Sequence, residues 1–146
     1  MIMLVIITMI YSYYNGVEQN KVYISEIKRY NATKIFDNKD LDYLISEINY
    51  FQSKDKNNYM FFLDKASIYR NYNQFDKSQK ELAKAMKKKP LLEDNINFLY
   101  LYGEALYLSN DSENAKKYLI KAKTVDESSE YIEPINEMLN KIEQGI

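Results

Sequence analysis

The sequence contains neither cysteine nor histidine, and its three glycines stand far apart, at positions 16, 103 and 145. Without cysteine, the chain forms no disulfide, no thiolate metal site and no cysteine nucleophile. Without histidine, it lacks the side chain most often used as a general base and as a metal ligand. Three separated glycines also make no glycine-rich phosphate loop. We therefore expect a non-catalytic protein that holds no metal and no cofactor.

Charge of one sign is not in excess either, because 20 Lys and Arg residues face 21 Asp and Glu residues and the net charge is −1. Such a balance gives no long-range attraction toward nucleic acid, which is therefore not an expected partner. The run Lys87–Lys89 stands just before Pro90, in the last turn of a predicted helix. Cations are stabilising there because the C-terminal end of a helix carries a partial negative charge. Asp37, Asp40 and Asp42 lack the central glycine and final glutamate of a calcium loop, so we interpret them as acids at a helix start.

The one long apolar run is Met1–Tyr14, which reads MIMLVIITMIYSYY. As a helix it would extend roughly 21 Å at ~1.5 Å per residue, which is less than a ~30 Å hydrocarbon core. Three alternatives remain open. The run is a membrane anchor with its tyrosines at the headgroup level, the apolar core of a secretory signal, or a terminal helix buried against the rest of the chain.

We place a boundary after Gly16, so that residues 1–16 form the apolar segment and residues 17–146 form the main domain. Short apolar segments at an N-terminus usually direct export. We therefore expect a membrane-anchored or exported protein that contacts the membrane through Met1–Tyr14. A cytoplasmic location is the alternative, and it applies if the run is a buried helix.

Proline is nearly as rare as glycine, and only Pro90 and Pro134 interrupt a sequence in which apolar residues recur three and four positions apart. This spacing and the many helix-forming residues predict helices from residue 20 onward. Segments rich in Asn, Asp, Ser, Lys and Pro mark the helix ends, at residues 37–40, 54–58, 72–74, 90–95, 109–111 and 125–129. The sequence thus predicts an all-α fold of seven helices joined by short loops, in which neighbours run antiparallel.

The stretch 59–90 predicts one helix pair in detail. Large and small residues share the facing sides of its two helices, with Phe62, Ala66 and Tyr69 on the first and Phe75, Ser78, Leu82 and Ala85 on the second. The small residues let the two backbones approach, and the large ones fill the space that remains. Pro90 ends the second helix because proline cannot continue one.

The same order of residues returns 37 positions later, at Leu99, Gly103, Leu106, Ala115, Leu119 and Ala122, and more weakly within residues 25–58. It resembles the tetratricopeptide repeat (TPR), a helical hairpin of about 34 residues. No tryptophan opens a unit here, and Lys39, Asn73 and Asn110 replace the turn glycine of the family. Asn tolerates a left-handed backbone better than most residues. The resemblance implies an α-solenoid of antiparallel helix pairs, with two clear units and one degenerate unit.

Residues 130–141 continue the spacing by another 34 positions and supply a C-terminal capping helix. One side carries an apolar stripe and the other is polar, with Ile132, Ile135, Leu139 and Ile142 opposite Asn136, Glu137, Asn140 and Lys141. A one-sided terminal helix closes the core of a stack. We expect Ser128 or Ser129 as its N-cap. The regular helix should start near Glu133, because Pro134 fits only the first turn.

The first helices of TPR pairs line a concave groove, and the resemblance implies that this groove binds a peptide or helix of a protein partner. The groove residues predicted in this way are Arg29, Thr33, Leu63, Ser67, Arg70, Tyr100, Glu104 and Tyr107. TPR domains that grip a C-terminal carboxylate use Lys and Asn on this face. Here the corresponding places hold Leu63, Ser67, Tyr100 and Glu104, and Glu104 would repel a carboxylate, so we do not expect such a clamp.

The resemblance and the N-terminal run together predict a membrane-associated scaffold or adaptor that binds a protein partner. The alternative is a soluble chaperone-like or regulatory module whose N-terminal run is a buried helix. Three repeats are close to the minimum for a stable solenoid, so self-association through an exposed end is a further expectation.

Overall fold

The computed structural model describes residues 40–145, and every α-helix and 3₁₀-helix named below lies in this range, which contains no strand. The chain divides into two compact units, Met1–Lys56 and Asn57–Ile146, which are described separately. Several predictions lie outside the described residues and stay predictions. They concern the segment Met1–Tyr14, the boundary at Gly16, the helix expected between residues 20 and 36, the residues Asp37 and Lys39 at the break that follows it, and Arg29 with Thr33.

Helix α2, Leu41–Lys54, is the described part of the first unit. Asp40 precedes it as the N-cap, and its side chain accepts a hydrogen bond from the Asp42 N–H at 3.4 Å. The interpretation of Asp40 as a helix-start acid is therefore confirmed. Leu44 and Ile48 are buried, as a stripe at helical spacing predicts.

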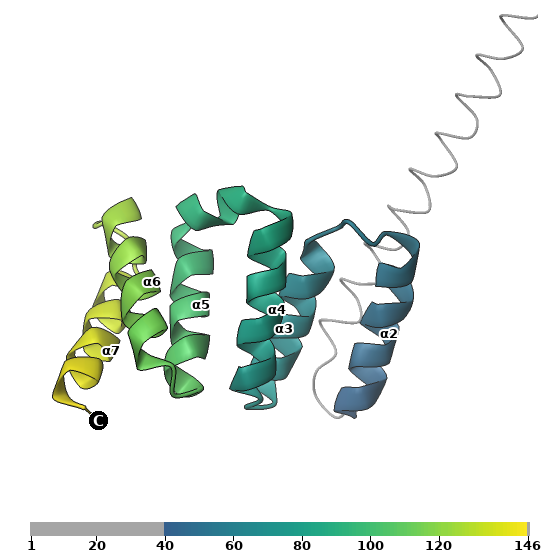
Figure 1. Cartoon of the computed structure of the whole chain (residues 1–146), viewed down its shortest axis with the longest axis horizontal. Helices are drawn as coiled ribbons and strands as arrows, with labels where there is room; N and C mark the ends of the chain where they lie inside the picture. The colour runs from purple at the N-terminus through teal and green to yellow at the C-terminus, as the bar shows by residue number, and fades with distance from the viewer. Residues whose placement is uncertain (1–39, 146) are drawn as a thin grey trace, which may run out of the picture. The chain divides into compact units, whose positions relative to one another are not determined.

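The second unit contains two helix pairs followed by a single helix (Figure 1). The first pair is α3, Met60–Asn71, with α4, Phe75–Lys88, and the second pair is α5, Ile96–Leu108, with α6, Ser112–Val125. Between the pairs lies a short 3₁₀-helix, η1, Pro90–Asp94, which begins at the proline that ends α4. The last helix is α7, Ile132–Gln144. The helix breaks predicted between residues 72 and 129 are confirmed.

Both pairs turn through the same backbone motif. Asn73 and Asn110 adopt positive φ angles of 56° and 64°. The Asn73 N–H donates to the Arg70 carbonyl at 2.9 Å, and the Gln74 N–H donates to the Tyr69 carbonyl at 2.8 Å. After α5, the N–H groups of Asn110 and Asp111 make the equivalent bonds, at 3.0 and 2.9 Å, to carbonyls in the last turn of that helix. These are Schellman motifs, in which a left-handed residue ends the helix, and the role predicted for the two asparagines is confirmed.

Small residues bring the helices of each pair together, as predicted. In the first pair, the buried Ser78 hydroxyl donates to the Ala66 carbonyl at 2.9 Å, which places α4 directly against the backbone of α3. In the second pair, a Cβ atom on Gly103 would lie 2.7 Å from the side chain of Leu119. Because that distance is far below van der Waals contact, a side chain at this position would force Leu119 to move.

The core continues from one pair to the next. One buried cluster joins all four paired helices, and it contains Ala66, Leu82, Ala85, Phe98, Tyr102, Ala105, Leu106 and Ala115. A second cluster joins α5, α6 and α7 through Leu99, Leu119, Ala122 and Ile135. Each pair therefore buries its apolar side against the next element, as in a repeat array.

Helix α7 closes this core with the predicted stripe. Ile135 is fully buried, and Leu139 and Ile142 pack beside it, while Glu137 and Asn140 are exposed. The predicted serine N-cap is wrong, because Tyr131 occupies that position without a capping side-chain bond. Ser129 lies two residues earlier, where its hydroxyl accepts from the Tyr131 N–H at 3.3 Å. Pro134 falls in the first turn, as expected.

Candidate functional site

The first helices of the second unit, α3, α5 and α7, carry a shared surface that we call the α3–α5–α7 face. Its members are Leu63, Ser67, Arg70, Tyr100, Glu104, Tyr131 and Met138. Within α3 and within α5 these residues lie three, four or seven positions apart, which places them on one side of each helix. On α7, Met138 follows the N-cap residue Tyr131 by seven positions. Contacts between helices then join the three sides into one surface.

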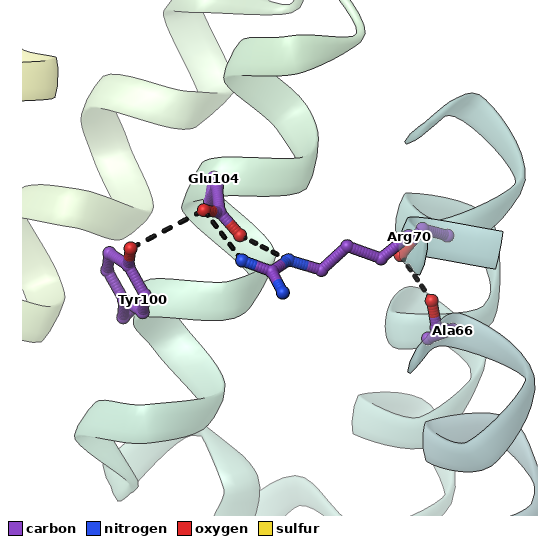
Figure 2. Close-up of polar contacts among 5 residues, drawn as sticks. Ala66, Arg70, Tyr100 and Glu104 are labelled. Atoms are coloured by element: carbon purple, nitrogen blue, oxygen red, sulfur yellow. Dashed lines mark hydrogen bonds and ion pairs between the residues drawn. The ribbon is translucent and has the colours of Figure 1, made fainter. Parts of the chain in front are cut away.

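An ion pair between Arg70 of α3 and Glu104 of α5 makes the first of these contacts (Figure 2). The Arg70 Nε donates to Glu104 Oε2 at 2.6 Å, and Nη2 donates to Oε1 at 2.9 Å. Two parallel bonds of this kind fix the orientation of a guanidinium more tightly than one bond would. The hydrogen bond to Glu104 also raises the pKa of Arg70 above its already high value, so Arg70 carries its charge throughout the physiological range.

Tyr100 extends this pair by one helical turn of α5 (Figure 2). Its hydroxyl donates to Glu104 Oε1 over a long 3.4 Å. Burial raises the pKa of the Tyr100 hydroxyl, and the neighbouring charge of Glu104 raises it further. The hydroxyl therefore stays protonated and can act as a donor.

The aromatic ring of Tyr100 makes the contact to α7. Its centroid lies 4.9 Å from that of Tyr131, with the two ring planes inclined at 30°. Both tyrosines and Met138 are half-buried against the core cluster of Leu99 and Leu119. The face therefore changes in character from a charged pair between α3 and α5 to an aromatic surface between α5 and α7.

The structure brings together three of the predicted groove residues, Arg70, Tyr100 and Glu104. Leu63 packs against the core as a half-buried residue, and Ser67 is exposed. Tyr107 follows Glu104 by three positions, in the last turn of α5. There it lines a hollow of about 500 Å³ together with Leu108, Asn110, Ser112, Ile142 and Gly145.

Sequence reasoning missed Tyr131 and Met138. The signal was present, because α7 continues the repeat spacing and Met138 follows Glu104 by 34 positions. The groove positions were projected onto the degenerate unit and the two clear units, and not onto the capping helix. The repulsive role expected of Glu104 also needs correction, because Arg70 neutralises its carboxylate.

In the range 40–145, no helix combines the length and the apolar character that crossing a bilayer requires. The sequence matches no family model and no curated protein.

Solved structures similar to this chain are TPR domains. The first TPR domain of Spaghetti (RPAP3), bound to an HSP90 peptide, aligns with a TM-score of 0.67 and 17% identity, covering 83% of this chain and 91% of that one. The TPR2B domain of yeast Sti1, in complex with pHsp70, aligns with a TM-score of 0.66 and 15% identity, covering 84% of this chain and 98% of that one. The Yersinia enterocolitica type III secretion chaperone SycD, with a peptide of the translocator YopD, aligns with a TM-score of 0.61 and 14% identity, covering 89% of this chain and 95% of that one. The chain therefore has the TPR fold, as the sequence predicted.

Proposed function

We propose that this protein is a non-catalytic adaptor of the chaperone-like or regulatory kind, which binds a segment of a protein partner on its α3–α5–α7 face. The supporting observation is that three predicted groove residues, Arg70, Tyr100 and Glu104, are joined on the first helices. Two of the similar TPR structures hold peptides, from HSP90 and from the translocator YopD.

The chemistry of the face suits an interface. Tyr and Arg are the side chains most often found at the centres of protein interfaces, because they combine a large contact area with directional polar groups. Here Tyr100 contacts the ring of Tyr131 and shares the carboxylate of Glu104 with Arg70. The second helices offer a different surface, with exposed lysines such as Lys77, Lys80 and Lys87 on α4.

A crosslinking pull-down tests this proposal. Tagged wild-type protein is compared with an Arg70→Gln, Tyr100→Ala double variant, and partners are identified by mass spectrometry. A matched control, Lys80→Gln with Lys87→Gln, removes charge from α4 and leaves the face intact. We expect partners that are lost from the face variant and kept by the control. Identical partner sets for the wild type and the face variant would refute the proposal, provided that circular dichroism shows the variant to be folded.

Membrane association is a second candidate property, and its support is the apolar composition of Met1–Tyr14. Fractionation of tagged full-length protein tests it. Retention in the membrane pellet after a high-salt wash, and release by detergent, is the result expected of an anchor. Recovery in the salt-washed supernatant would favour the alternative, in which the run is a buried helix.

A further inference from the structure

The Arg70–Glu104 pair presents donors rather than acceptors to a ligand. Glu104 accepts bonds at both oxygens, from Arg70 and from Tyr100, and its side chain is 14% exposed. A guanidinium carries five N–H groups, of which two donate to Glu104. The Arg70 side chain is 40% exposed. The pair is electrically neutral as a whole, yet its accessible part is the cation.

No second cation reinforces Arg70 on the neighbouring helix, since α5 has the sequence INFLYLYGEALYL. What adjoins the pair on its α7 side is aromatic, because Tyr100 touches both Glu104 and Tyr131. A ligand at this place therefore meets one guanidinium beside an aromatic surface. A chain-terminal carboxylate is attached directly to the backbone, whereas the carboxylate of Asp or Glu stands on a flexible arm. A carboxylate on such a side chain can reach a guanidinium that is only partly exposed, while the peptide backbone stays at the surface.

We propose that the segment bound on the α3–α5–α7 face carries an internal Asp or Glu that pairs with Arg70, next to an aromatic or large aliphatic residue that packs on Tyr100 and Tyr131. This inference rests on the proposed function and specifies the partner's chemistry. Carboxylate and guanidinium form strong charge-assisted bonds, and aromatic side chains stack favourably on tyrosine. A lysine in place of the acid would face the like charge of Arg70 and would be disfavoured.

Selection from displayed peptide libraries tests this chemistry on the full chain. One library presents random dodecamers with both ends blocked by fusion, and a second presents them with a free C-terminus. Each is selected on the wild type, on Arg70→Gln, on Arg70→Lys and on a Tyr100→Ala, Tyr131→Ala variant. Lys121→Gln, which breaks an exposed ion pair with Glu93 elsewhere on the unit, is the matched control. Circular dichroism verifies that each variant is folded.

The expected result is enrichment of Asp or Glu beside an aromatic or aliphatic residue in the blocked library. The acid preference should disappear on Arg70→Gln and weaken on Arg70→Lys, while the control keeps it. In fluorescence anisotropy, changing the acid of a selected peptide to the amide should weaken binding to the wild type about tenfold. The same change should have little effect on binding to Arg70→Gln.

The two proposals fail in different ways. Peptides that need Tyr100 and Tyr131 but show no acid preference would overturn the inference and leave the binding face standing. Enrichment confined to the free C-terminus would overturn it as well, in favour of a terminal carboxylate. If the selected peptides bind the Tyr100→Ala, Tyr131→Ala and Arg70→Gln variants as well as they bind the wild type, the proposed face itself is refuted.

Discussion

The α3–α4 pair and the α5–α6 pair share one register, yet different residues form the helix crossing in each. Ala66 and Ser78 meet through a hydrogen bond of 2.9 Å in the first pair. At the equivalent places of the second pair, 37 positions on, stand Gly103 and Ala115, and the Leu119 side chain fills the space that a Cβ on Gly103 would need. One crossing is therefore polar and the other depends on volume alone, so the two should respond differently to substitution.

The largest effect is expected from truncating Leu119. Leu119 is fully buried, whereas its counterpart Leu82 is 4% exposed. Leu119→Ala should lower the free energy of unfolding by about 2–5 kcal/mol, and by more than Leu82→Ala. The reason is that the cavity opens beside a glycine, which has no side chain to refill it. Urea unfolding followed by circular dichroism measures both variants. A larger loss from Leu82→Ala would contradict the contrast between the two crossings.

The next effect in size is expected from Gly103→Ala. Alanine favours a helix interior over glycine by about 1 kcal/mol. The added methyl would however lie 2.7 Å from the Leu119 side chain, and overpacking of this kind costs about 1–3 kcal/mol. We therefore expect net destabilisation in thermal or urea unfolding. The double variant Gly103→Ala, Leu119→Val should recover part of the loss. Stabilisation by Gly103→Ala alone would show that the crossing has room to spare.

A smaller effect is expected from Ser78→Ala, which gives the first pair the residue that the second pair has in Ala115. The substitution removes the bond to the Ala66 carbonyl and should lower the unfolding free energy by about 1 kcal/mol. Ser78→Thr serves as a control that keeps the hydroxyl but adds a methyl group. If Ser78→Ala is neutral or stabilising in urea unfolding, the hydrogen bond contributes nothing to the crossing.

The smallest effect at neutral pH is expected from Tyr102→Phe. Burial raises the pKa of the Tyr102 hydroxyl, and the charges expected on Tyr118 and Asp111 raise it further. The folded protein therefore favours the neutral phenol, and this contribution is present below the ordinary tyrosine pKa of about 10. It is lost as pH rises above that value, because the unfolded chain ionises first. Between about pH 8 and about pH 11, the free energy of unfolding of the wild type should therefore fall by more than that of Tyr102→Phe. Parallel pH profiles of urea unfolding would contradict this.

Sequence reasoning succeeded where the pattern is contained in one hairpin. The αL turns at Asn73 and Asn110 follow from the tolerance of asparagine for that backbone. The crossings follow from small residues at helical spacing. It failed where a side chain meets a different hairpin or a different unit of the repeat. Glu104 was expected to repel a carboxylate, and its ion pair with Arg70 and the contact between Tyr100 and Tyr131 were not foreseen.

The buried charged residues of the α3–α4 pair were not predicted from the sequence either. Glu81 is buried between α3 and α4, with its carboxylate 3.4 Å from Lys65 Nζ and 2.6 Å from Lys84 Nζ. Lys65 itself is buried and lies over the Phe62 ring, 5.3 Å from its centroid. Apolar residues spaced three and four positions apart mark only the apolar side of a helix. A charged residue that is buried because an opposite charge pairs with it does not belong to this pattern, so the spacing does not predict its burial.

By itself, the sequence determined the order of the helices, the two asparagine turns, the small residues at each crossing and the apolar stripe of α7. These features depend on local backbone preference and on spacing within one helix or hairpin. Only the tertiary structure decided that Arg70 reaches Glu104, that Tyr100 meets Tyr131 and that Tyr107 lines a hollow with residues of α6 and α7. Such contacts depend on the small rotation between successive helix pairs, which residue spacing within a pair does not encode.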